Sequence, residues 1–105
     1  MDHEHYMRRA INVARRNPEA PFGAILVDRE IAEILAEGVN DARRNPILHG
    51  EIAAILGCVE AQPAADWSRL ALYTTAEPCP MCTRACLMVH NGSQIISAAM
   101  TTIAR

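Results

Sequence analysis

The chain has 105 residues, of which 50% are hydrophobic and 21% charged, and its net charge at pH 7 is −2. This length predicts a single domain over residues 1–105, and the composition excludes a disordered chain. The slight acidic excess gives no reason to expect general affinity for nucleic acid phosphates. The apolar runs are too short to cross a bilayer, and the N-terminal residues lack the apolar core of a signal peptide. We therefore expect a cytoplasmic protein without a membrane partner.

Two clusters of arginine stand out against this balance. The first cluster consists of Arg8, Arg9, Arg15 and Arg16, and the second consists of Arg43 and Arg44. The simplest interpretation is a solvated helix face and a solvated loop. A local basic patch that binds phosphate is the alternative.

The first half of the chain predicts a helix followed by a hairpin. Residues 3–17 form the expected helix, with Met7, Ala10, Ile11 and Ala14 as its apolar stripe. Prolines in "NPEAP" end it. Strands are expected at 22–28 and 33–40, paired with each other, although the segment between them lacks a typical turn residue. Gly23 inside the first strand indicates a close approach by another element.

The second half predicts two helices and two strands. After a loop at 41–48 we expect a helix at 49–60, with Ile52, Ile55, Leu56 and Val59 on one face. A strand at 69–75 is uninterruptedly apolar, which is typical of a sheet covered on both faces. A helix at 79–90 has a proline in its first turn and "NG" as its stop. A last strand is expected at 94–99.

This order of elements predicts an α/β fold. The sheet should have four strands in mixed orientation, with helices packed on it. The segment from 69 to 99 should form a parallel strand–helix–strand crossover.

Cys79 and Cys82 are the first candidates for chemistry. Their spacing places them on one helix face, at an N-terminal end where unpaired N–H groups favour thiolates. Two thiolates alone make a weak zinc site, and His49, which also begins a helix after a loop, is the best-placed third ligand. Three protein ligands would leave one position for water, as in catalytic zinc sites, where the pKa of that water drops to about 7. A structural metal knuckle or two buried thiols are the alternatives.

Glu51 is the candidate proton carrier. If it and His49 were both helical, their side chains would point about 200° apart, which disfavours joint ligation of one metal. A glutamate is nevertheless long enough to reach a water held on that metal. The alternative is a carboxylate that merely stabilises a helix start. We expect Cys58 and Cys86 to be core residues, and His3 and His5 to be exposed.

Together these motifs carry a family resemblance. The chain contains the pattern H-x-E, followed after 26 residues by P-C-x-x-C. This pattern resembles the signature of the zinc-dependent cytidine and deoxycytidylate deaminase superfamily. "PFGAILVD", "GVND" and "LYTTAEPCPMC" resemble the branch with guanine deaminases, tRNA adenosine deaminases and fungal-type cytosine deaminases. The resemblance covers nearly all of residues 1–100. It implies a three-layer α-β-α fold.

The resemblance also implies roles for single residues. His49, Cys79 and Cys82 would bind Zn²⁺, and Glu51 would act first as base and then as acid. Asn40 would hydrogen-bond the substrate base, although it is also a common turn residue. The backbone around Ala76 and Glu77 would line the pocket. Hydroxide held by zinc would attack the ring carbon that bears the amino group, and ammonia would leave.

The chain also departs from the family pattern. Gly50 stands where alanine is usual, and Arg84 replaces a small residue. Relatives usually continue with a further strand and helices that close the pocket, so we expect a C-terminally short domain that self-associates as a homodimer or higher oligomer. The expected substrate is a guanine- or cytosine-type nucleobase or nucleoside. The alternatives are adenosine in tRNA or single-stranded nucleic acid, and an inactive zinc-binding scaffold.

Overall fold

The structure, a computed structural model, describes residues 2–76, 79–89 and 94–97. Its elements follow the predicted order, with one additional 3-10 turn, η1, before the third strand. They are α1 His3–Ala14, β1 Gly23–Asp28, β2 Glu33–Val39, α2 Gly50–Ala61, η1 Trp67–Arg69, β3 Leu70–Thr74, α3 Pro80–Val89 and β4 Gln94–Ser97. The last part of the expected strand at 94–99, His90 and the "NG" helix stop lie outside the described residues.

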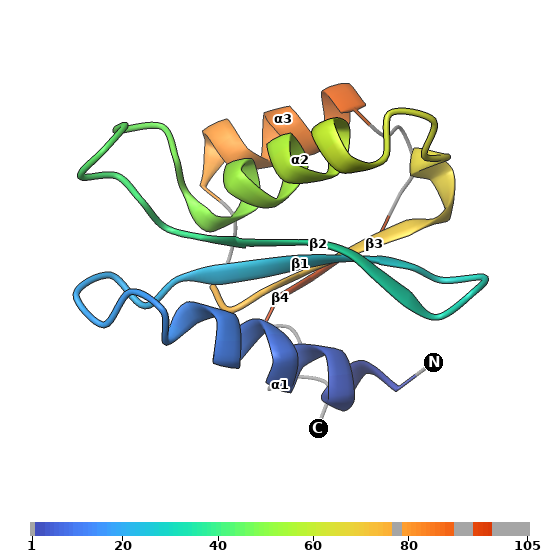
Figure 1. Ribbon diagram of the computed structural model, residues 1–105, viewed down its shortest axis with the longest axis horizontal. Coiled ribbons are helices and arrows are strands. Elements are labelled where there is room, and N and C mark those ends of the chain that lie inside the picture. Colours follow the sequence, from blue (N-terminus) through green and yellow to red (C-terminus); the bar gives the residue numbers. More distant parts are fainter. Residues whose placement is uncertain (1, 77–78, 90–93, 98–105) are drawn as a thin grey trace.

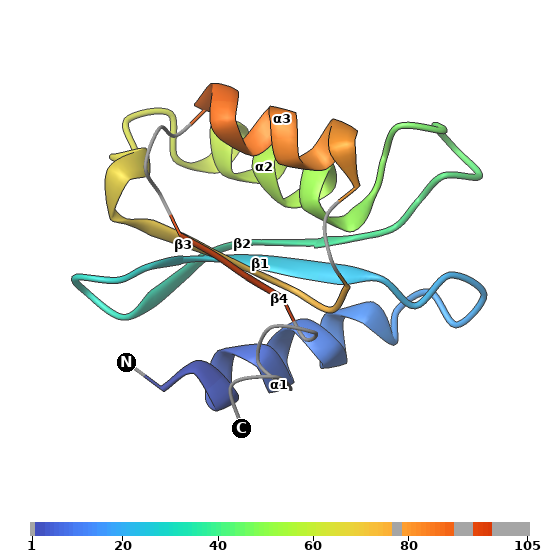
Figure 2. The same ribbon diagram turned by 180° about the vertical axis from the view of Figure 1, so that it is seen from behind.

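The four strands form one mixed sheet in the order β2-β1-β3-β4. β1 is antiparallel to both β2 and β3, which confirms the hairpin, and β3 is parallel to β4, which confirms the parallel crossover. Helix α1 covers one face of the sheet, while α2 and α3 cover the other (Figures 1 and 2). The predicted three-layer α/β fold is therefore confirmed.

The core has two halves, one on each side of the central strands. β1 and β3 are buried along their whole length, as expected for strands covered on both faces. One cluster packs α1 against the sheet and includes Tyr6, Val13, Ile25 and Tyr73. The other packs α2 and α3 against the opposite face.

The expected stripe of α1 was partly wrong. Met7, Ala10 and Ala14 are buried as predicted, but Ile11 is exposed and Val13 is buried instead. The buried arc is centred on Ala10, and the next residue along the helix is turned about 100° away from it. The spacing rule alone does not determine where this centre lies.

The expected face of α2 was partly wrong, since Ile55 is buried as predicted but two other members of that face are exposed. Leu56 and Val59 are 50% and 47% exposed, whereas Ala54, Ile55 and Cys58 pack on the sheet. The small side chains of Ala54 and Cys58 allow the helix to approach the strands closely, while Leu56 and Val59 face outward.

The arginine clusters are exposed and largely paired. Arg8 pairs with Glu4 within α1, and Arg9 and Arg16 both bind Glu37 on β2. In the second cluster, Arg43 pairs with Glu19 and Arg44 with Asp41. This agrees with solvated surfaces. None of the described helices is long and apolar enough to cross a membrane.

Candidate functional site

The candidate site lies at one edge of the sheet. β2 and β3 run in the same direction, since each is antiparallel to β1. The chain therefore leaves both strands at the same edge and enters α2 and α3 there. The edge where strands end and helices begin is where α/β folds usually bind ligands.

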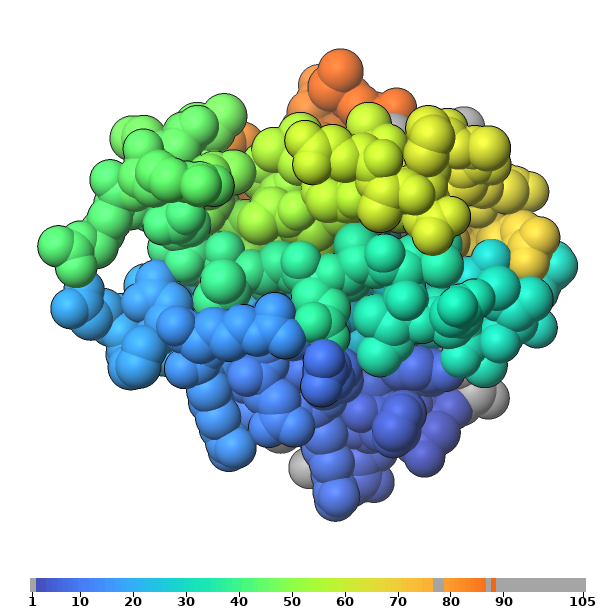
Figure 3. Space-filling view, in the orientation of Figure 1, coloured from blue at the N-terminus to red at the C-terminus, as the bar shows by residue number. Residues whose placement is uncertain are grey.

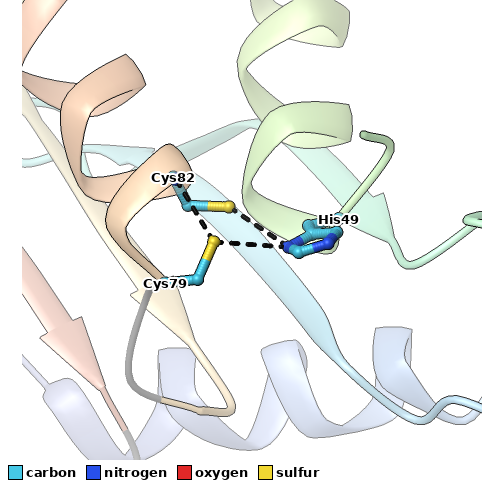
Figure 4. A group of neighbouring side chains, drawn as sticks. All are labelled: His49, Cys79 and Cys82. Atoms are coloured by element: carbon cyan, nitrogen blue, oxygen red, sulfur yellow. Dashed lines mark hydrogen bonds between the residues drawn. The ribbon is translucent and has the colours of Figure 1, made fainter. Parts of the chain in front are cut away.

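His49, Cys79 and Cys82 converge at this edge. The Nδ1 atom of His49 lies 3.5 Å from the Sγ atom of Cys79 and 3.6 Å from that of Cys82. All three donor atoms lie within 4.8 Å of one another. Figure 4 shows the imidazole at the start of α2 facing the two sulfurs at the start of α3.

These distances fit a tetrahedral zinc ion. Zinc–sulfur bonds of about 2.3 Å and zinc–nitrogen bonds of about 2.0–2.1 Å, at tetrahedral angles, place a sulfur and a nitrogen ligand about 3.5 Å apart. The observed separations of 3.5 and 3.6 Å match this value. One nitrogen and two sulfurs are also ligands that zinc prefers. No fourth ligand joins the group among the residues that the structure describes.

Each helix start orients its ligands. His49 is the N-cap of α2, with extended backbone angles, and its side chain makes no capping bond. The imidazole is therefore available to the cysteines. Cys79 immediately precedes α3, and its Sγ atom accepts a hydrogen bond of 3.5 Å from the backbone N–H of Cys82. Such N–H groups at a helix start stabilise a thiolate.

In the metal-free chain, the expected thiolate preference does not hold for Cys82. Burial, reinforced by the neighbouring Glu51 and Cys79, raises the pKa of this thiol far above its ordinary value. Burial and the charge of Glu51 also raise the pKa of Cys86 to about 11. A metal that binds Cys82 must therefore displace a proton.

Glu51 is buried at the same edge, with only 6% of its surface exposed. The Thr74 hydroxyl donates to its Oε1 atom over 3.2 Å. The expected divergence from His49 does not arise, because His49 has extended and not helical backbone angles. Both side chains line one pocket.

This pocket has a volume of about 290 Å³. Its walls contain the sequence candidates His49, Glu51, Cys79, Asn40 and Ala76, together with Phe22. Glu77 lies outside the described residues. Sequence reasoning missed Phe22 as a pocket residue. Its position directly before Gly23, where the chain enters a buried strand, was the available signal.

Asn40 has a turn role in addition to its place in the pocket. Its Oδ1 atom accepts a hydrogen bond of 3.1 Å from the backbone N–H of Ala42. Its own backbone N–H donates to the carbonyl of Phe22 over 2.9 Å. Since Oδ1 is occupied, the side-chain NH₂ group is the part that remains to donate to a ligand.

Two glycines allow the close packing behind the site. A Cβ atom on Gly23 would lie 2.9 Å from the carbonyl oxygen of Ala10, which confirms the predicted close approach, here by α1. A Cβ atom on Gly38 would lie 2.3 Å from the carbonyl oxygen of Gly50 and 2.3 Å from the backbone nitrogen of Ala54. β2 therefore touches the first turn of α2, next to His49 and Glu51.

Replacing Gly38 by alanine is expected to destabilise the fold and displace the site. The added methyl group would meet helix backbone, which cannot rotate away, so the cost should be about 3 kcal/mol or more. Gly57→Ala is the matched control, because a Cβ atom there meets only the Ala36 methyl group at 4.0 Å. That variant should be stabilised by about 0.5–1 kcal/mol. Equal urea unfolding midpoints for the two variants would contradict the prediction.

The remaining candidates have structural surroundings. Cys58 and Cys86 are buried in the core, as expected. His3 and His5 are exposed, and His3 also bonds the hydroxyl of Tyr73 across the α1 side of the sheet. Arg84 is exposed on α3.

Comparison with known proteins points to one family. The family described as "Cytidine and deoxycytidylate deaminase zinc-binding region" matches residues 1–100. Guanine deaminase of Bacillus subtilis is 36% identical over 88 residues, which cover 78% of this chain and 55% of that protein. A tRNA-specific adenosine deaminase of Rickettsia bellii is 34% identical, with 75% and 58% covered. A probable cytosine deaminase of Schizosaccharomyces pombe is 35% identical, with 76% and 50% covered.

Solved structures have the same fold as this chain. The crystal structure of the B. subtilis guanine deaminase superposes with a TM-score of 0.80 at 29% identity, covering 99% of this chain and 70% of that one. A structure in complex with 2,6-diaminopurine also has a TM-score of 0.80, at 27% identity, with 92% and 56% covered. The chain thus spans between half and three fifths of the length of the curated relatives named above.

Proposed function

The chain belongs to the cytidine and deoxycytidylate deaminase family, and we propose that it removes the exocyclic amino group from a guanine- or cytosine-type nucleobase or nucleoside by zinc-dependent hydrolysis. One observation carries this proposal. His49 and Cys79, two members of the N,S,S ligand group completed by Cys82, line the same pocket as the buried carboxylate of Glu51.

The three ligands would hold one Zn²⁺ ion. Bound there, zinc would lower the pKa of a water molecule to about 7 and so supply hydroxide at neutral pH. The lack of a fourth ligand among the described residues fits a site with an open position for that water.

Glu51 is the proposed proton carrier. It would take a proton from the attacking water and return protons to the ring nitrogen and to the amino group, so that water and substrate become the carbonyl product and ammonia. Proton transfer by a well-placed carboxylate contributes about 10²–10⁴-fold to a rate. Its burial in the pocket that His49 and Cys79 also line supports this role.

The dimensions and the lining of the site favour a small substrate. A pocket of about 290 Å³ is at the low end of the usual range for small ligands. Phe22 adds an aromatic wall, which suits a planar base.

A second candidate is adenosine in RNA. Asn40 also borders a groove of about 520 Å³ that contains Arg16 and Arg43. In Figure 3 this groove lies between the blue segment at 16–19 and the green loop that begins near residue 40. Both arginines are paired with glutamates, so the groove offers little unpaired positive charge. Charge therefore favours the small substrate.

Ammonia release from a substrate panel tests the proposal. The chain, loaded with one zinc per molecule, would be offered guanine, cytosine, their nucleosides and a tRNA stem-loop, with the chelator-treated chain as control. We expect turnover of a base or nucleoside. Turnover of the stem-loop alone would favour the RNA substrate. Full zinc binding without any turnover would favour an inactive zinc-binding scaffold.

Replacing Asn40 by aspartate separates its two roles. Aspartate still accepts the hydrogen bond from Ala42 but lacks the NH₂ donor. If that donor binds the substrate, kcat/KM should fall about tenfold or more. Asn45→Asp is the matched control, because Asn45 caps Ile47 in the same way and lies outside the pocket. Equal kinetics for the two variants would leave Asn40 with only a turn role.

A further inference from the structure

Thr74 is an unusual residue at the end of an apolar strand. It is the last residue of β3 and is 1% exposed, and the other residues of this strand are hydrophobic. Burying a hydroxyl group costs free energy unless it has a hydrogen-bond partner. The partners of this hydroxyl therefore indicate why a polar side chain stands here.

Both partners of the hydroxyl belong to pocket residues. Its Oγ1 atom lies 3.2 Å from Oε1 of Glu51 and 3.0 Å from the carbonyl oxygen of Ala76. One hydroxyl proton serves only one acceptor at a time. Thr74 therefore lies between two acceptors of the pocket and donates either to the buried carboxylate or to the carbonyl of Ala76.

The hydroxyl itself is held rigidly. Thr74 pairs with Ala24 across the two central strands, β3 and β1, and this pairing fixes its backbone conformation. Its branched Cβ atom restricts the first side-chain torsion, so the direction of the hydroxyl group is defined. Glu51 has three rotatable torsions, and a donor fixed in this way selects among them.

A second neighbour of Glu51 is less suited to this task. The buried Cys82 thiol also interacts with the carboxylate of Glu51, and this interaction contributes to the raised pKa of the thiol. Cys82 is a proposed zinc ligand, however, and a ligating cysteine carries no S–H proton. Of these two donors, only the Thr74 hydroxyl remains when a metal is bound.

We propose that Thr74 is a positioning residue for Glu51. Its hydroxyl holds one carboxylate oxygen against the end of β3, so that the other oxygen faces the pocket and the ligand group. This role rests on the proposed function, since it matters for turnover only if Glu51 carries protons.

Three substitutions test this role by kinetics. Thr74→Val removes the hydroxyl but keeps the branched shape, and should lower kcat about tenfold while KM stays within about twofold. Zinc should remain at one ion per chain. Thr74→Ser restores the hydroxyl and should recover most of kcat. Thr75→Val is the matched control, because the Thr75 hydroxyl bonds the backbone N–H of Gly23 and not Glu51.

A second readout is independent of turnover. Urea unfolding of the metal-free chain gives the ratio of folded to unfolded protein for each variant. Thr74→Val should lower this ratio both in the wild-type chain and in a Glu51→Ala chain. The decrease should be at least about threefold larger in the wild-type chain, because only there is a carboxylate present to lose its hydrogen bond. An active wild-type chain whose Thr74→Val variant keeps full kcat would overturn the role, as would the absence of coupling between the two positions. An inactive wild-type chain would instead contradict the proposed function.

Discussion

Replacement of Cys82 by serine is expected to reduce bound zinc from the proposed one ion per chain to a small fraction of that and to remove the proposed deaminase activity with it. A serine hydroxyl is a poor zinc ligand at neutral pH, and the two remaining ligands make a weak site. His49→Ala should have the same effect. Metal content after gel filtration, measured by atomic emission, checks both variants.

Cys58→Ser is the matched control for this experiment. Cys58 and Cys82 are both fully buried cysteines, but Cys58 lies in the core and outside the ligand group. The control should lose some stability through a buried hydroxyl while keeping its zinc. If His49→Ala or Cys82→Ser retained full zinc content, the proposed ligand set would be wrong.

Replacing Glu51 by glutamine should lower kcat by about 10²–10⁴-fold while zinc content stays at one ion per chain. Glutamine has the same shape and still accepts the hydrogen bond from Thr74. Glutamine cannot take up a proton from water. A lower kcat would therefore result from lost proton transfer and not from a change in the shape of the pocket. Steady-state ammonia release, with metal analysis of the same sample, measures both quantities.

The control for this substitution lies on the same helix. Glu60→Gln removes a carboxylate from the exposed end of α2, far along the helix from the ligand group. Its kinetics should match the wild type. If Glu51→Gln also kept wild-type turnover, the proton carrier would have to be another group.

Several features of the fold followed from local sequence patterns. The uninterrupted apolar run at 69–75 correctly predicted a strand buried on both faces, because helices cover both sides of β3. Gly23 correctly predicted a close approach, since only a residue without a Cβ atom fits against α1 there. Pro80 begins α3 as expected, because its missing N–H is not needed in a first turn.

Other features depended on contacts between distant segments. The same spacing rules predicted burial of Ile11, Leu56 and Val59, and all three are exposed. A periodic pattern defines a helix and its possible faces. The sheet that the helix packs against decides which face is buried, and the small residues Ala54 and Cys58 made the closer contact.

The candidate site shows the same division between local pattern and tertiary structure. The identity of the ligand candidates His49, Cys79 and Cys82 and of the carboxylate Glu51 came from sequence alone. Residue type, the short spacing within each motif and the resemblance to the deaminase family indicated them together. Only the tertiary structure decided that these atoms meet. Their separations of 3.5 and 3.6 Å depend on two helix starts brought to one sheet edge by β2 and β3 running in the same direction. Thr74 as a partner of Glu51 was equally invisible to pattern, because a hydrogen bond between residues 23 positions apart exists only once the sheet and α2 have packed.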